Sequence, residues 1–297
     1  SSNKAWLYFH KMIRDFDYFK KINVKIHDPD YIDLLREYIY FLTKDGRKFL
    51  NEFDTNICYF IIWDIFNQFI ECAKENDYDI KKIPDYEFRK STVLTLMKAF
   101  KQIVSIDKFF YRRRTFDNTV CNFFNNEFVH FNDFDIYANG IRTLSFLCDL
   151  KFRPITDEYT DSKVHLKFEI FFEKEDLISK LLVDLADTVK IPFDSPFDDI
   201  PGHICNIIHR LSIQIRDNID DQTFIHDNLG IYYSLPHHLI MESKSIENII
   251  HTLENRDVMS KFRTCKLVSY ILDGPSSLVN QILHLKMIII VASFLES

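Results

Sequence analysis

Residues 246–272 read IENIIHTLENRDVMSKFRTCKLVSYIL, and this stretch decides the fold class. Its first part predicts a short amphipathic helix, with Ser243 and Ser245 before it as expected caps. Asp257 opens a second helix, and Gly274 followed by Pro275 ends it, because Gly favours the position just past a helix and Pro opens the next. The expected inner stripe of the second helix is Val258, Phe262, Cys265, Val268 and Leu272.

The same kind of pattern predicts helices over most of the remaining chain. Only 5 of 297 residues are Gly and 8 are Pro, which leaves little material for strained loops or tight turns. The expected helices span residues 5–26, 29–43, 55–74, 86–105, 117–131, 133–150, 203–216 and 276–295. The 29 Phe and 14 Tyr predict a core built largely from aromatic rings. We therefore expect an all-α protein.

One segment, residues 163–172, fits two structures. Its apolar residues alternate as in a strand, but the same region also belongs to a helical stripe that continues to Val189. We favour a long helix or two stacked ones, because no other segment offers a strand a clear partner. Residues 154–161 are expected to form a loop.

Residues 246–272 resemble an armadillo or HEAT-type helical repeat, in which a short helix ends in a polar turn and a longer helix packs behind it. Cys265 would be the small residue near the middle of the longer helix. Phe128 to Leu150 resembles the same pattern, with Asp133 at the turn and Ala138 and Gly140 as small residues. The candidate turns near residues 54, 85, 133, 199 and 257 are spaced irregularly, so a degenerate solenoid and a non-repetitive helical domain both fit. The resemblance implies an elongated, irregular helical array whose concave face binds a peptide or another protein.

We expect one helical domain over residues 1–297, with a bend or sub-domain boundary at residues 190–202. That segment is rich in Pro and must be irregular. Phe193 and Phe197 lie within it and are candidates for contact with a partner. The chain begins with Ser1-Ser2 rather than Met, which predicts a piece of a longer protein.

The net charge of −7 disfavours non-specific nucleic-acid binding, which usually needs a basic surplus. The run Arg112, Arg113, Arg114 is the exception. It could dock an acidic segment, a phosphorylated peptide or a nucleic-acid backbone, or it could be a solvated helix end. A nucleic-acid-binding helical module is therefore an alternative function.

The six cysteines lack metal-site spacing, and we expect free thiols in a reducing compartment, the cytoplasm or nucleus. No apolar run is long enough to span a membrane.

No nucleophile or phosphate-binding motif is present. Phe224 to Asp227 resembles the His-Asp pair of HD phosphohydrolases, which implies a metal held by His209, His226 and Asp227. The gap between the two histidines is short for that family, and the residues around His226 indicate a loop. We therefore expect no enzyme activity, no metal and no cofactor. The favoured function is a non-catalytic scaffold for protein–protein interaction, with a divergent metal-dependent hydrolase as a further alternative.

Overall fold

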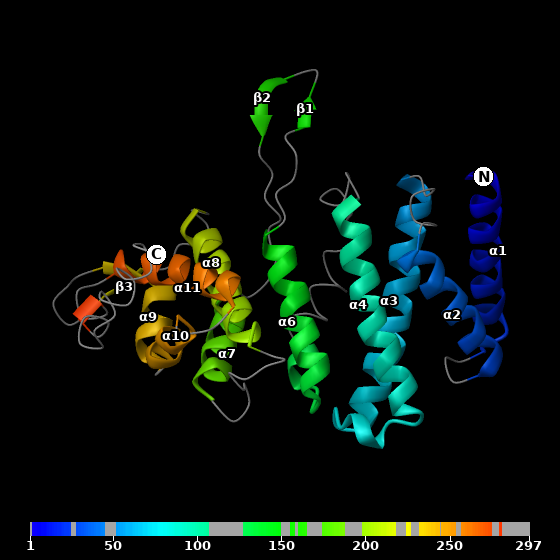
Figure 1. The fold of residues 1–297 in the computed structure, drawn as a ribbon, viewed down its shortest axis with the longest axis horizontal. Helices are drawn as coiled ribbons and strands as arrows, with labels where there is room; N and C mark the ends of the chain where they lie inside the picture. The colour runs from blue at the N-terminus through cyan, green and yellow to red at the C-terminus, as the bar shows by residue number, and fades with distance from the viewer. Residues whose placement is uncertain are drawn as a thin grey trace. The chain divides into compact units, whose positions relative to one another are not determined.

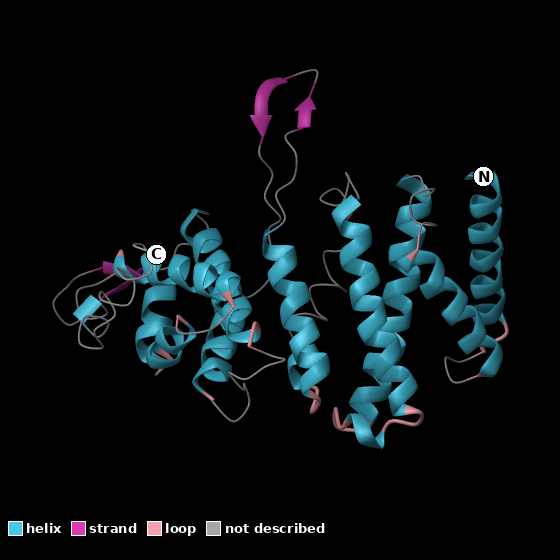
Figure 2. Cartoon of the chain, in the orientation of Figure 1, coloured by secondary structure: helices cyan, strands magenta, loops and turns pink. Residues whose placement is uncertain are grey.

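In the computed structural model, ten α-helices make up most of the residues whose placement is described, and the fold is all-α (Figure 2). The structure describes residues 2–24, 28–44, 52–106, 127–149, 155–157, 160–164, 174–187, 198–217, 224–226, 232–243, 245–253, 257–274 and 279–280. In that part of the chain, every helix is too short or too polar to cross a lipid bilayer. The strands among these described residues form two short antiparallel pairs.

The chain divides into two compact units, whose helices are labelled in Figure 1. Unit 1 contains residues 1–143 and 152–166, and unit 2 contains residues 144–151 and 167–297. The helices wholly in unit 1 are α1 (Ser2–Lys21), α2 (Pro29–Thr43), α3 (Glu52–Glu75) and α4 (Tyr86–Ile106). Those of unit 2 are α7 (Lys174–Ala186), α8 (Ile200–Asp217), α9 (Leu235–Glu242), α10 (Ile246–Thr252) and α11 (Val258–Leu272). Helix α6 (Phe134–Asp149) contributes residues to both units.

The core of unit 1 is aromatic, as the composition predicts. Phe9 stacks on Phe41 with ring centroids 5.5 Å apart, which joins α1 to α2. Trp63 meets Phe100 edge to face at 5.2 Å and joins α3 to α4. Two short 3-10 turns, η2 (Ile80–Lys82) and η6 (Phe128–His130), lie in the loops before α4 and α6. Aromatic pairs of this kind are worth about 0.5–1.5 kcal/mol beyond the apolar area that they bury.

The core of unit 2 is aliphatic and centres on α8. The most extensive helix contact is between α8 and α11, and α7 and α10 also pack on α8. Pro201 and Gly202 lie in the first turn of α8, so the irregular segment expected at 190–202 ends earlier than predicted. Residues 188–197 lie outside the described part of the chain.

The favoured helix over residues 163–172 is wrong where the structure describes it. Residues 155–157 form β1 (Ile155–Asp157) and residues 160–164 form β2 (Thr160–Val164), so the loop expected at 154–161 is also wrong there. The two strands pair with each other, Ile155 opposite Val164, so the missing partner was local. Residues 165–173 lie outside the described residues, and the later part of the predicted stripe is confirmed in α7.

A second strand pair joins β3 (Phe224–His226) to β4 (Tyr232–Ser234), with Ile225 opposite Tyr233.

The helix bounds agree well with the sequence predictions around α10 and α11. Ser245 occupies the position before α10 but its side chain makes no capping hydrogen bond. Asp257 caps α11 as predicted, accepting a hydrogen bond from the Ser260 backbone N–H at 3.0 Å.

The inner stripe predicted for α11 is partly wrong. Val258, Phe262 and Leu272 are exposed. The buried face of α11 instead consists of Ser260, Thr264, Leu267, Val268, Tyr270 and Ile271. The reason is a close approach to α8: a Cβ at Gly202 would overlap the Cα, Cβ and Oγ of Ser260. Two helices can approach this closely only where small residues face each other.

Candidate functional site

Most of the site residues predicted from sequence lie outside the described part of the chain. These are Arg112, Arg113, Arg114, Phe193, Phe197 and Asp227. His226 lies in β3 and His209 in α8. The structure therefore brings none of these residues together in a described site.

His209 has surroundings that disfavour a bound cation. Burial and the nearby charges of Arg210, Lys266 and Arg216 lower the pKa of His209 to about 4. Its Nδ1 atom is buried without a hydrogen-bond partner, and its ring meets Tyr270 edge to face at 6.4 Å. Within the described residues, no group of three His, Cys, Asp or Glu side chains could hold a metal ion.

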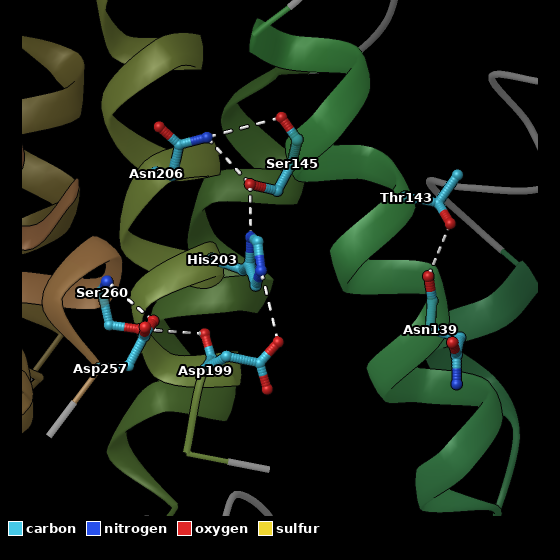
Figure 3. A network of polar contacts seen from close by, with 8 residues as sticks. All are labelled: Asn139, Thr143, Ser145, Asp199, His203, Asn206, Asp257 and Ser260. Carbon is cyan, nitrogen blue, oxygen red and sulfur yellow. Dashed lines mark hydrogen bonds and ion pairs between the residues drawn. The ribbon is translucent and has the colours of Figure 1, made fainter. Parts of the chain in front are cut away.

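A serine, a histidine and an aspartate meet in the core of unit 2 (Figure 3). The Ser145 hydroxyl lies 2.8 Å from Nδ1 of His203, and Nε2 of His203 lies 3.4 Å from the Asp199 carboxylate. Nδ2 of Asn206 donates to the same hydroxyl at 2.9 Å. These are the residue types of a hydrolase triad. Such a triad can act only if a substrate can reach the serine hydroxyl, so the exposure of Ser145 decides between a catalytic and a structural role.

Access is absent at Ser145, which is 1% exposed and lies within α6, four residues before the helix ends. The backbone N–H groups of a helix interior are committed to intrahelical bonds, so they cannot form an oxyanion hole. The hydroxyl accepts a hydrogen bond from Asn206 and shares a second one with Nδ1 of His203, so both neighbours lie on α8. The network is therefore a structural connection between α6 and α8, which the Asp149–Arg210 ion pair at 3.0 Å reinforces.

The same network continues to α11 through polar side chains. Oγ of Ser260 donates to the Asp257 carboxylate at 2.7 Å and lies 3.5 Å from the backbone oxygen of Asp199. Thr143, also drawn in Figure 3, donates only to the Asn139 carbonyl oxygen of its own helix, at 2.7 Å. The contacts of Ser260 help to fix the position of α11 against α8 within unit 2.

Unit 1 has an open cleft of about 390 Å³ between α1, α2 and α3, which we call the α1–α3 cleft. Its lining residues are Ile13, Phe16, Asp17, Lys20, Asn23, Val24, Tyr31, Ile57, Phe60, Ile61, Asp64 and Gln68. Phe16 and Tyr31 are buried, whereas Phe60 is 53% exposed. The cleft is therefore lined by both apolar and polar side chains, and its charged residues are exposed.

Local backbone geometry forms one end of the cleft. Helix α1 ends at Lys21, and Asn23 adopts a left-handed conformation with a φ of 58°. Asn tolerates this conformation better than most residues, so it can reverse the chain where a helix ends. The turn brings Val24 to the cleft wall.

The charged side chains of the cleft are not neutralised by one another. Asp17 and Lys20 from α1 and Asp64 from α3 are exposed. Within the described residues none of the three forms an ion pair, and Asp64 accepts one hydrogen bond, from Gln68 at 3.3 Å. Burial, and after it the charge of Asp64, raises the pKa of Tyr31 to about 12, so Tyr31 stays neutral. Two carboxylates at the mouth favour a basic group on whatever the cleft binds.

The cleft was not predicted from the sequence, because Phe60 lies within the apolar run 58–63, which is typical of a buried helix. A signal was present on the same face of α3. Ile57, Phe60 and Ile61 are followed at helical spacing by Asp64 and Gln68, both polar. A face that turns polar within one or two turns is only partly buried.

Comparisons of this chain with protein-family models, with curated proteins and with solved structures found no match.

Proposed function

We propose that this protein is a non-catalytic helical scaffold that binds a segment of another protein in the α1–α3 cleft. The observation that carries the proposal is the half-exposed Phe60 in the wall of a 390 Å³ cleft that also contains Ile13, Phe16 and Ile61. Hollows of roughly 300–1,000 Å³ accept side chains or small ligands, and apolar lining supplies most of the affinity. A Leu or Phe side chain buried there contributes about 1.5–3 kcal/mol.

The charges at the mouth indicate what the bound segment carries. Asp17 and Asp64 favour a Lys or Arg close to the apolar side chain that enters the cleft. Lys20 can meet a backbone carbonyl or an acidic side chain of the same segment. The expected ligand is a peptide segment with an apolar side chain beside a basic one.

We also propose that the helices of unit 2 follow an irregular armadillo or HEAT-like arrangement. The support is the pairing of the short helix α10 with the longer α11, which Asp257 caps at its start. Such helix pairs stack into scaffolds with extended binding surfaces.

The cysteines support a reducing compartment, such as the cytoplasm or nucleus. All five cysteines that the structure describes are free. Burial raises the pKa of Cys205 to about 12 and that of Cys148 well above its ordinary value. Such thiols are unreactive and have no need of an oxidising environment.

A selection from a random peptide-display library tests the cleft. Peptides enriched by the wild-type chain should share an apolar residue next to Lys or Arg, and Phe60→Glu should abolish their binding. Phe262→Glu is a matched control, because Phe262 is 50% exposed on unit 2. Equal binding by wild type and Phe60→Glu, or equal loss in both variants, would overturn the proposal.

A further inference from the structure

Helix α1 carries a second surface on the side away from the core of unit 1. Its residues follow the alternating three- and four-residue spacing of a coiled-coil seam. They are Lys4, Leu7, Lys11, Arg14, Tyr18 and Lys21, all exposed, and we call them the α1 outer face. The opposite side of α1 is buried against α2 through Phe9, Met12 and Phe16.

This face is basic although the chain as a whole carries a net charge of −7. Within the described residues, Lys4, Lys11, Arg14 and Lys21 form no ion pair. Two carboxylates border the face, the half-buried Asp15 at one edge and the exposed Asp17 at the other. Figure 1 shows α1 at the end of unit 1, with α2 on its inner side. With the two bordering carboxylates counted, the face keeps a surplus of two positive charges, which an anionic partner can neutralise.

The spacing favours a helix as that partner. Leu7 and Tyr18 are eleven residues apart, about 16 Å along the axis at 1.5 Å per residue, and supply two apolar anchor points. Between them lie Lys11 and Arg14, whose long aliphatic stems can cover apolar surface while the charged ends reach outward. Leu7 and Tyr18 therefore offer a facing helix two apolar contacts, with two cationic side chains between them.

The charge excludes a second copy of this chain. If two α1 outer faces met in an antiparallel pair, Lys11 would lie opposite Arg14 and Lys4 opposite Lys21. If they met in parallel, each cation would lie opposite its own copy. Like charges in contact destabilise both arrangements.

We propose that the α1 outer face binds an acidic amphipathic helix of a second protein. Apolar side chains of that helix meet Leu7 and Tyr18, and its carboxylates meet Lys11 and Arg14. The surface is distinct from the α1–α3 cleft, which uses other faces of α1, so one scaffold joins two partners.

Fluorescence anisotropy with labelled synthetic peptides tests the proposal. The acidic probe has 21 residues, with Leu and Phe eleven positions apart and Glu at the positions that face Lys11 and Arg14. A second probe replaces each Glu with Lys, and a third scrambles the acidic sequence. Vesicles containing phosphatidylserine and a single-stranded oligonucleotide are the competing anionic probes.

Only the acidic probe should bind, and its affinity should fall as salt rises, because the pairs are solvent-exposed. Lys11→Glu with Arg14→Glu should weaken binding about tenfold or more, whereas binding of the cleft-selected peptides should not change. Lys81→Glu with Lys98→Glu is the control, since it makes the same change of charge at exposed positions outside α1. Equal binding of the acidic and scrambled probes, binding only to vesicles or oligonucleotide, or full binding by the α1 variant would overturn the proposal.

Discussion

Ser145 is a buried hydroxyl that serves two neighbours on another helix, and its value to the fold can be measured. Ser145→Ala leaves the Asn206 amide and the His203 ring without this partner inside a dry core. An unsatisfied buried polar group costs about 1–3 kcal/mol, so the free energy of unfolding should fall by that amount in chemical denaturation.

Thr143 provides the matched control for Ser145. It lies on the same helix and is equally buried, but its hydroxyl bonds only to Asn139 of its own helix. Thr143→Val should cost less than about 1 kcal/mol, because the Asn139 carbonyl already accepts a helical bond. Equal losses in both variants would contradict the assigned role of the Ser145 network.

His209 should make stability depend on pH. Its pKa is about 4 in the folded chain, against about 6.5 in an unfolded one. Between these values the unfolded chain binds more protons, so stability is full above about pH 6.5 and falls as the pH drops toward 4. The loss due to His209 should reach about 1–2 kcal/mol at pH 5, after allowing for the partial exposure of the ring.

Denaturation at pH 7.5 and at pH 5 checks this contribution. Carboxylates elsewhere also titrate in this range, so the informative quantity is the difference between the wild type and His209→Gln. The variant should lose less stability on acidification than the wild type. The same substitution at the exposed His251 is the control, and an unchanged pH dependence in His209→Gln would disprove the assignment.

At the scale of elements, the existence of helices could be predicted but the buried face of α11 could not. Apolar periodicity predicted Val258, Phe262 and Leu272 as its inner stripe, and they are exposed. The contact surface contains Ser260 and Thr264, because close approach rewards small side chains more than apolar ones. Whether a helix packs closely depends on the side chains of its neighbour. For α11 the deciding neighbour is Gly202 on α8, some 60 residues away in sequence.

Gly202→Ala tests the close approach of α8 and α11. An added methyl group would overlap the Cα of Ser260, which cannot move without shifting α11. The overlap should outweigh the gain of about 1 kcal/mol in helix propensity, for a net loss of about 1–3 kcal/mol. A variant as stable as the wild type in denaturation would show that α8 and α11 are farther apart than described.

At the scale of the whole molecule, the candidate site was the least predictable feature. The α1–α3 cleft combines side chains from helices about 40 residues apart in sequence, and no local motif marks it. The strand pair at 155–164 was missed for the opposite reason. The two strands are separated by only two residues, within a segment that was expected to be a loop. Local patterns predict elements, whereas sites arise from the way the elements pack.

The division into two compact units predicts that damage to one leaves the other intact. Each unit has its own core, aromatic rings in unit 1 and aliphatic side chains around α8 in unit 2. Opening of one cooperative unit exposes its own amides to exchange while the other stays protected. In hydrogen exchange, Gly202→Ala should therefore accelerate the amides of α8 and α11 and leave those of α3 and α4 at wild-type rates. Equal acceleration in both sets would mean that the chain unfolds as one cooperative body. Destabilising unit 2 would then also abolish binding at both proposed surfaces of unit 1, the α1–α3 cleft and the α1 outer face.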